Sequence, residues 1–139
     1  MRFVSPETVR IQLADGPDGS KNWIEIKKDL TAGEEKRYRS SGLRRMTART
    51  GTDGSDIDID WQTMAFARVE AYLLDWSARD AKDKPIMIAS DKQKRDALEA
   101  LDPVDFEEID AAIQNHMTAR AEEKKATTGS PTPTATSPS

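Results

Sequence analysis

The chain has 139 residues, with 21 basic and 25 acidic side chains, a net charge of −4 and an isoelectric point near 5.1. This balance argues against a protein whose whole surface binds nucleic acid, because such binding needs a concentrated positive field. The chain contains no cysteine, which excludes disulfides, thiolate metal sites and cysteine nucleophiles.

Charged residues make up 33% of the chain and hydrophobic ones 36%, so the sequence predicts a modest core for one domain over residues 1–125. The N-terminal sequence MRFVSPETVR has no apolar stretch of signal-peptide length. No apolar run approaches the roughly 18 residues of a membrane-spanning helix. We therefore expect a soluble, non-secreted protein without a membrane partner.

Two alternating segments near the N terminus predict a β-hairpin over residues 9–27. They flank DGPDGS (15–20), which is rich in turn-forming residues. The core-facing side chains of the first strand are predicted to be Val9, Ile11 and Leu13. Those of the second strand are expected to be Trp23 with Ile24 or Ile26. The adjacent Trp23 and Ile24 leave the register of this strand open.

A helix is predicted over residues 32–48, where Thr31 and Glu34 match a capping box in which each side chain satisfies the other's backbone N–H. The apolar content of this helix is thin, and Gly42 within it costs about 1 kcal/mol relative to alanine. Its expected core contacts are Tyr38, Leu43 and Met46.

The longest apolar-periodic run predicts a central helix over residues 58–79. Apolar side chains recur there in two adjacent stripes, one with Phe66, Val69, Leu73 and Trp76, the other with Met64, Ala67, Ala71, Leu74 and Ala78. A helix that is apolar over most of its circumference must be covered on more than one side. Asp56 or Asp58 is expected to cap this helix.

Two further helices are predicted, over residues 91–101 and 103–122, after a short extended segment at 85–88. Ser90 and Gln93 form a second capping box, and Asp102 is the N-cap before a proline at the first helical position. The last helix carries one narrow apolar stripe, with Phe106, Ile109, Ile113 and Met117.

These elements predict a mainly α fold with a small N-terminal β-hairpin (α+β). A compact helical domain is followed by residues 126–139, which contain only Ala, Thr, Gly, Ser and Pro. Such a composition buries too little apolar surface to offset chain entropy, so we expect a disordered Thr/Ser/Pro tail.

An aspartate ladder, formed by Asp53, Asp56, Asp58 and Asp60, resembles a calcium-binding loop in composition but not in spacing. An EF-hand loop begun at Asp56 needs glycine at its sixth position and glutamate at its twelfth. The chain has Trp61 and Ala67 there. We interpret the ladder as helix capping and predict no metal site.

A basic run places six positive side chains within residues 36–49 with no acidic residue among them: Lys36, Arg37, Arg39, Arg44, Arg45 and Arg49. The simplest interpretation is a solvated helix face partly neutralised by the aspartate ladder. An acidic protein partner is the first alternative. Nucleic acid is the second, although Tyr38 alone is too little aromatic surface for stacking on single strands.

The only histidine, His116, is interpreted as a surface or boundary residue, because no sequence pattern assembles a nucleophile or metal ligands around it. Trp23, Trp61 and Trp76 are interpreted as core residues, and an exposed one among them would be the first candidate for a partner contact. We predict no catalytic, cofactor-binding or metal-binding residues, no cofactor and no enzymatic activity.

The order of these features resembles the tail assembly chaperones of long-tailed (siphovirus-like) bacteriophages, over about residues 9–125. The resemblance rests on a short hairpin with WIEIKKDLTAGEEKRY, a central helix ending AYLLDWSARDAKDKPI, and SDKQKRDALEALDPVDFEEIDAAI before a low-complexity end. Its most specific parts are the pair Asp75–Trp76 before a charged turn and proline, and Leu101–Pro103 before a Phe-x-x-Ile helix.

This resemblance implies a non-catalytic protein of the host cytoplasm that binds the tape measure protein, keeps it soluble and helps to recruit tail tube protein. It also implies absence from the mature virion. We expect an apolar groove between the central and last helices to hold an amphipathic partner helix, with the basic run attracting an acidic one. No motif identifies partner-binding residues.

Two other classes of function stay open. A structural virion component, such as a head–tail connector or minor tail protein, would form stable homo-oligomers and occur in purified particles. A small nucleic-acid-binding regulator would show steeply salt-dependent affinity. The sequence does not decide whether the chain forms homo-oligomers.

Overall fold

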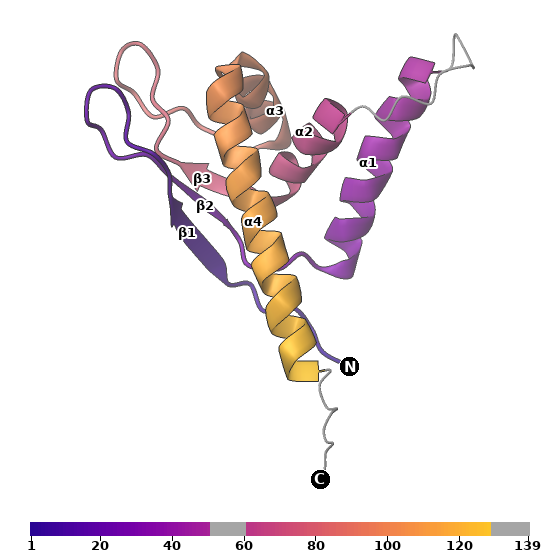
Figure 1. Cartoon of the computed structure of the whole chain (residues 1–139). Coiled ribbons are helices and arrows are strands. Elements are labelled where there is room, and N and C mark those ends of the chain that lie inside the picture. Colours follow the sequence, from indigo (N-terminus) through magenta and orange to yellow (C-terminus); the bar gives the residue numbers. More distant parts are fainter. Residues whose placement is uncertain (51–60, 129–139) are drawn as a thin grey trace.

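The computed structural model of the chain describes residues 1–50 and 61–128, with side chains for 1–41 and 62–126 (Figure 1). The described residues form four helices and a three-stranded antiparallel sheet of order β1–β2–β3. This is the mainly helical α+β fold that the sequence predicts. The elements are β1 (Thr8–Gln12), β2 (Trp23–Lys27), α1 (Ala32–Thr50), α2 (Trp61–Tyr72), β3 (Leu73–Trp76), α3 (Asp91–Ala100) and α4 (Pro103–Thr128).

The predicted hairpin is confirmed, and its pairing settles the register that the sequence left open. Ile11 pairs with Ile24 and Val9 with Ile26, so both isoleucines of β2 point into the core, where they are fully buried. The prediction that Trp23 faces the core is wrong, because alternation along β2 puts Trp23 on the opposite face of the sheet. There the guanidinium of Arg10 lies 3.8 Å from the centre of its ring, a cation–π contact.

The predicted central helix over residues 58–79 is wrong from residue 73 onward, because α2 ends at Tyr72 and the chain continues as strand β3. Leu73 pairs with Ile26 and Trp76 with Ile24, with a register irregularity between them that leaves Leu74 without a partner. This β-bulge lets two residues three apart both face the core. The spacing that reads as a helical period therefore arises in a bulged strand.

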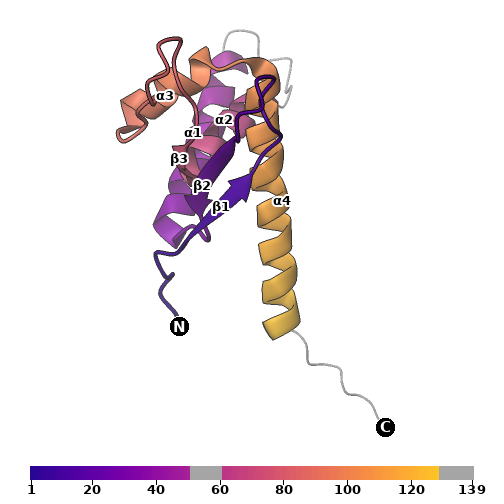
Figure 2. The same ribbon diagram turned by 90° about the vertical axis from the view of Figure 1, so that its left-hand side faces the viewer.

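The core lies where the sheet, α2 and α4 meet (Figures 1 and 2). The predicted stripe of α4 is confirmed, since Phe106, Ile109 and Ile113 are buried and Met117 is partly buried against them. The other buried members of this cluster come from β2, α2, β3, α3 and the loop before α3: Ile24, Ile26, Ala65, Val69, Tyr72, Leu73, Trp76, Ile88 and Leu98.

The predicted helix starts are confirmed where the structure describes them. Thr31 and Glu34 exchange the two hydrogen bonds of a capping box, as do Ser90 and Gln93. The side chain of Asp102 accepts from the backbone N–H of Val104 at 2.8 Å. Carboxylate and hydroxyl oxygens at these positions satisfy N–H groups that have no partner within the helix.

Helix α4 extends to Thr128, past the predicted end at residue 122 and into the predicted tail. A paired contact of Arg120 with Asp29, with distances of 3.0 and 2.8 Å, fixes this half of α4 to the segment between β2 and α1. Residues 129–139 of the predicted tail lie outside the described residues, as do Asp56 and Asp58, the predicted caps of α2. No helix in the described part of the chain is long and apolar enough to cross a membrane.

Candidate functional site

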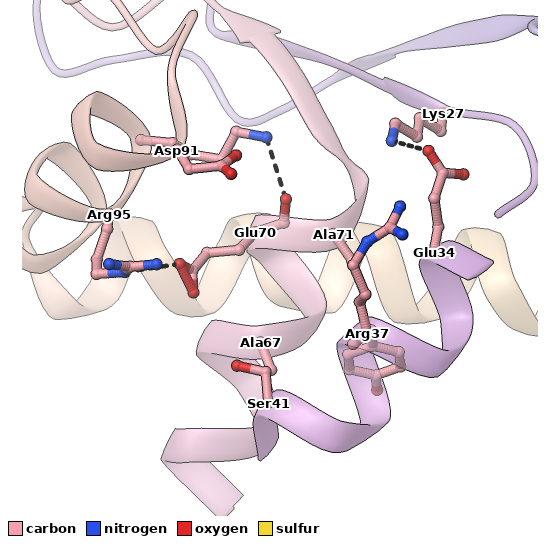
Figure 3. A pocket seen from close by; sticks show the side chains of 11 residues that line it. Lys27, Glu34, Arg37, Ser41, Ala67, Glu70, Ala71, Asp91 and Arg95 are labelled. Carbon is pink, nitrogen blue, oxygen red and sulfur yellow. Dashed lines mark hydrogen bonds and ion pairs between the residues drawn. The ribbon is translucent and has the colours of Figure 1, made fainter. Parts of the chain in front are cut away.

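Two depressions lie on different faces of α2, and each collects side chains from several elements. The first, the charged cavity, has a volume of about 370 Å³ and lies between β2, α1, α2 and α3 (Figure 3). It is lined by Lys27, Glu34, Arg37, Tyr38, Ser41, Ala67, Glu70, Ala71, Asp91, Lys94 and Arg95.

Two ion pairs stand in the wall of the charged cavity. Lys27 of β2 binds Glu34 of α1, and Arg95 of α3 lies 3.3 Å from the carboxylate of Glu70 of α2. The pKa of Glu34 is lowered, first by the hydrogen bond from Lys27 and then by the backbone N–H of Thr31. The N3 residue of a capping box therefore also anchors the sheet to α1.

Two further cations line the charged cavity without a carboxylate partner among the described residues. The half-buried Lys94 donates to the backbone carbonyl of Glu70 at 3.1 Å, and its pKa is lowered by burial and then by the nearby Lys27. Arg37 makes no ion pair with the described residues, and Figure 3 shows its guanidinium on the same side of the cavity as Glu34. With four cations against three carboxylates in its lining, the cavity has an excess of one positive charge.

The second depression, the apolar groove, has a volume of about 510 Å³ between α2, α3 and α4. Its lining is mostly apolar and consists of Ala65, Phe66, Leu98, Leu101, Pro103, Phe106 and Ala111, with Gln62, Glu99, Glu107, Asp110 and Gln114 as the polar members. Phe66 and Phe106 stack with their ring centres 4.3 Å apart. The predicted groove between central and last helices thus exists, and α3 forms a third wall that was not predicted.

A buried ion pair holds α2 to α4 beside the apolar groove. The guanidinium of Arg68 donates to both carboxylate oxygens of Asp110, at 2.7 and 3.0 Å, and Gln114 donates to the same carboxylate at 2.7 Å. The pKa of Arg68 is raised, chiefly by this contact with Asp110. A bidentate ion pair of this kind, in which both carboxylate oxygens accept hydrogen bonds, fixes the spacing of the two helices that form the walls of the groove.

The remaining candidate residues of the sequence have structural positions. His116 donates from Nε2 to the backbone carbonyl of Lys28 at 2.8 Å and meets Tyr72 edge-on with ring centres 6.3 Å apart. Trp76 is buried and donates to the carbonyl of Ile86 at 2.9 Å. Both agree with their interpretation as boundary and core residues. Trp23 is half-buried beneath Arg10, on the sheet face away from the core.

Part of the basic run is described. Lys36, Arg37 and Arg39 are exposed on α1, and Arg39 pairs with Glu35 at 2.8 Å. The side chains of Arg44, Arg45, Arg49, Leu43, Met46 and Trp61 lie outside the described residues, as does the whole aspartate ladder. Within the described chain, no group of three or more His, Asp or Glu side chains is arranged to hold a metal ion.

Sequence reasoning missed the charged cavity because its cations come from three elements, β2, α1 and α3, and α3 is far from the other two in the chain. Lys27 ends a strand, Arg37 belongs to the basic run, and Lys94 and Arg95 lie in a helix rich in both charges. In the fold, β2 pairs with β3, and the end of β2 and the start of α3 line the same cavity. Comparisons with models of protein families, with curated proteins and with solved structures found no match.

Proposed function

We propose that the chain is a tail assembly chaperone of a long-tailed bacteriophage, acting in the host cytoplasm without catalysis and absent from the mature virion. Its client is the tape measure protein, one amphipathic helix of which it holds in the apolar groove. The observation that supports this proposal is the groove itself, because a helix that packs into a groove needs an apolar floor with a polar rim. Such a floor is formed here by side chains of three helices.

The rim of the apolar groove favours a client helix with cations beside its apolar stripe. Glu99 and Glu107 line the groove, are exposed, and make no ion pair with the described residues. Complementary charge at a rim raises the association rate and orients the partner more than it adds affinity. The groove thus favours a basic client helix, whereas the basic run suggests an acidic one. The basic run does not bear on the groove, because no described residue of α1 lines it.

Reversible holding fits the size of the site. A groove of about 510 Å³ accommodates a few side chains from one helix turn. Such a contact buries far less surface than the roughly 1,600 Å² of a stable protein complex. A client that must be released as the tail tube polymerises needs this weaker kind of contact. The tail tube protein would then meet the client after its release from the groove.

The test is co-expression with the tape measure protein of the same phage, followed by size-exclusion chromatography and mass spectrometry of the complex and of finished particles. We expect a soluble complex, and no copy of the chain in particles. Fixed copies in particles without a soluble complex would refute the proposal and identify a structural virion component.

A matched pair of variants locates the contact. Ala111→Gln puts a polar side chain into the apolar groove, whereas Ala119→Gln makes the same change at an exposed position of α4 that lines no described depression. We expect Ala111→Gln to weaken the complex about tenfold, a loss of about 1.4 kcal/mol, and Ala119→Gln to leave it unchanged. Equal affinity of the two variants would exclude the groove as the client site.

A further inference from the structure

We propose that the charged cavity binds one carboxylate group of a ligand, through Lys94 of α3 and Arg37 of α1. This site does not depend on the proposed function, because it lies on another face of α2 from the apolar groove. Its ligand is defined by the side chains that line the cavity.

The first argument concerns the hydrogen-bonding capacity left in the cavity. An ammonium group has three N–H donors, and Lys94 uses one of them on the backbone carbonyl of Glu70. A guanidinium has five N–H donors in a fixed plane that matches a carboxylate, and Arg37 makes no hydrogen bond to the described residues. Two cationic donors from different helices therefore line one cavity, and neither is hydrogen-bonded to a carboxylate of the described residues.

The second argument concerns the number of charges. Glu34 and Glu70 each occupy one cation of the wall, Lys27 and Arg95 respectively, and Asp91 adds one more negative charge to the lining. The excess of one positive charge matches a monoanion. A phosphate dianion would place a second negative charge among three carboxylates, and like charges at such distances repel.

The third argument concerns the surroundings of Lys94. Ala67 and Ala71 of α2 form an apolar part of the cavity lining. Burial lowers the pKa of the Lys94 ammonium and repulsion from Lys27 adds to this, while the nearby carboxylates of Asp91 and Glu70 only partly oppose it. A bound carboxylate would offset both effects. Charge-assisted hydrogen bonds in such partly desolvated places are stronger than those at an open surface.

A carboxylate can reach this cavity from two sources, a free carboxylic acid or the side chain of a glutamate or aspartate in a partner protein. Sodium propionate and the capped peptide acetyl-Ala-Glu-Ala-amide present the same group in these two forms. Tighter binding of the peptide would identify a protein side chain as the source. Equal or weaker binding of the peptide would identify a free acid.

The experiment is an NMR titration of the full chain with each probe, following the Arg37 side-chain Nε–H, the Ala67 and Ala71 amides, and the Lys94 side-chain carbon shifts with pH. We expect saturable shifts at the cavity and a higher Lys94 pKa in the presence of either probe. No saturable shift with either probe, or tighter binding of inorganic phosphate than of propionate, would overturn the proposal.

Two matched pairs of variants distinguish a site from general attraction of anions. Lys94→Gln and Arg37→Gln remove cations of the cavity, whereas Lys92→Gln and Arg39→Gln remove cations of the same two helices that are paired at the surface with Asp96 and Glu35. We expect about tenfold weaker binding for each cavity variant and unchanged binding for each control. Arg37 is exposed, so its variant keeps the test valid even if Lys94→Gln disturbs the fold. Equal binding by Arg37→Gln and Arg39→Gln would exclude the site.

Discussion

The Arg68–Asp110 pair joins α2 to α4, with side chains only 16% and 12% exposed. Removal of the carboxylate in Asp110→Ala leaves a largely buried guanidinium without its anion. We expect a loss of about 2 kcal/mol in the free energy of unfolding, between the values typical of exposed and of fully buried pairs. Urea denaturation at pH 7 measures this loss.

The control for this prediction is Asp96→Ala, which removes a carboxylate paired with Lys92 on the exposed surface of α3, where the side chains are 85% and 61% exposed. It should cost less than about 0.5 kcal/mol. The double variant Arg68→Met/Asp110→Leu should recover most of the stability, because an apolar pair replaces the ion pair without leaving a charge behind. If Asp110→Ala and Asp96→Ala cost the same, the pair does not hold the helices together.

We expect Asp29, which lies between β2 and α1, to make the free energy of unfolding depend on pH. Its pKa is lowered chiefly by hydrogen bonds from Arg120, with help from Lys124 and against the effect of burial. A carboxylate whose pKa is lower in the folded state stabilises the fold above its unfolded pKa of about 3.9. That contribution is lost as the pH falls through the folded-state pKa.

We therefore expect Asp29→Asn to be less stable than the wild type at pH 7 and the difference to shrink towards pH 3. Urea denaturation at several pH values measures both curves. The control Asp15→Asn removes an exposed carboxylate of the hairpin turn, where the side chain is 51% exposed. A gap between Asp29→Asn and the wild type that stays constant from pH 7 to pH 3 would contradict this account.

At the scale of elements, the sequence and the structure disagree most at β3. Leu73 and Trp76 continue the helical stripe of Phe66 and Val69, and nothing local in the sequence stops the helix at Tyr72. The stop comes from β2, whose second edge pairs with β3. Backbone N–H and C=O groups left unpaired at that edge would be costly when buried. This requirement of β2 cannot be read from the local sequence of residues 73–76.

A peptide of residues 61–79 separates the local preference from the demand of the fold. We expect it to be helical through Trp76 in trifluoroethanol, which favours helix beyond native content, because no β2 is present to pair with residues 73–76. Cα chemical shifts locate the end of the helix. A control peptide of residues 103–122 should be helical along its length, as in the protein. A helix that ends at Tyr72 in the isolated peptide would mean that the stop is local after all.

The sequence predicted the starts of α1, α3 and α4 well, because the signals for them are local rather than set by a distant strand. The capping boxes at Thr31 and Ser90 and the Asp102–Pro103 start act within a few residues, so a local pattern contains them. The stripe of α4 was also readable, because one face of a helix records its burial at regular spacings. The charged cavity was not, since a cation's sequence neighbours do not show which distant helix it will face.

At the scale of the whole molecule, the core is unevenly shared among the helices. The sheet, α2 and α4 supply most of the fully buried side chains, whereas no described side chain of α1 belongs to the buried set. Figure 1 shows α1 on the outer side of α2, away from the sheet. Over its described side chains, α1 packs along α2 and is held by the Lys27–Glu34 pair and by a hydrogen bond between Tyr38 and Arg68 of α2. Opening α1 would therefore expose less apolar surface than unfolding the chain.

Native-state hydrogen exchange should resolve this difference. We expect amides of residues 36–41 in α1 to exchange through a partial opening of lower free energy, with a weak dependence on denaturant, because little surface is exposed. Amides of Ile24, Ile26 and Ile113 should exchange only on global unfolding, since their side chains are fully buried.

Because α1 carries Arg37, loss of α1 would also remove one wall of the charged cavity, so propionate should slow exchange in α1 selectively. Identical free energies and denaturant dependence for α1 and Ile113 would show instead that the chain opens as one cooperative unit.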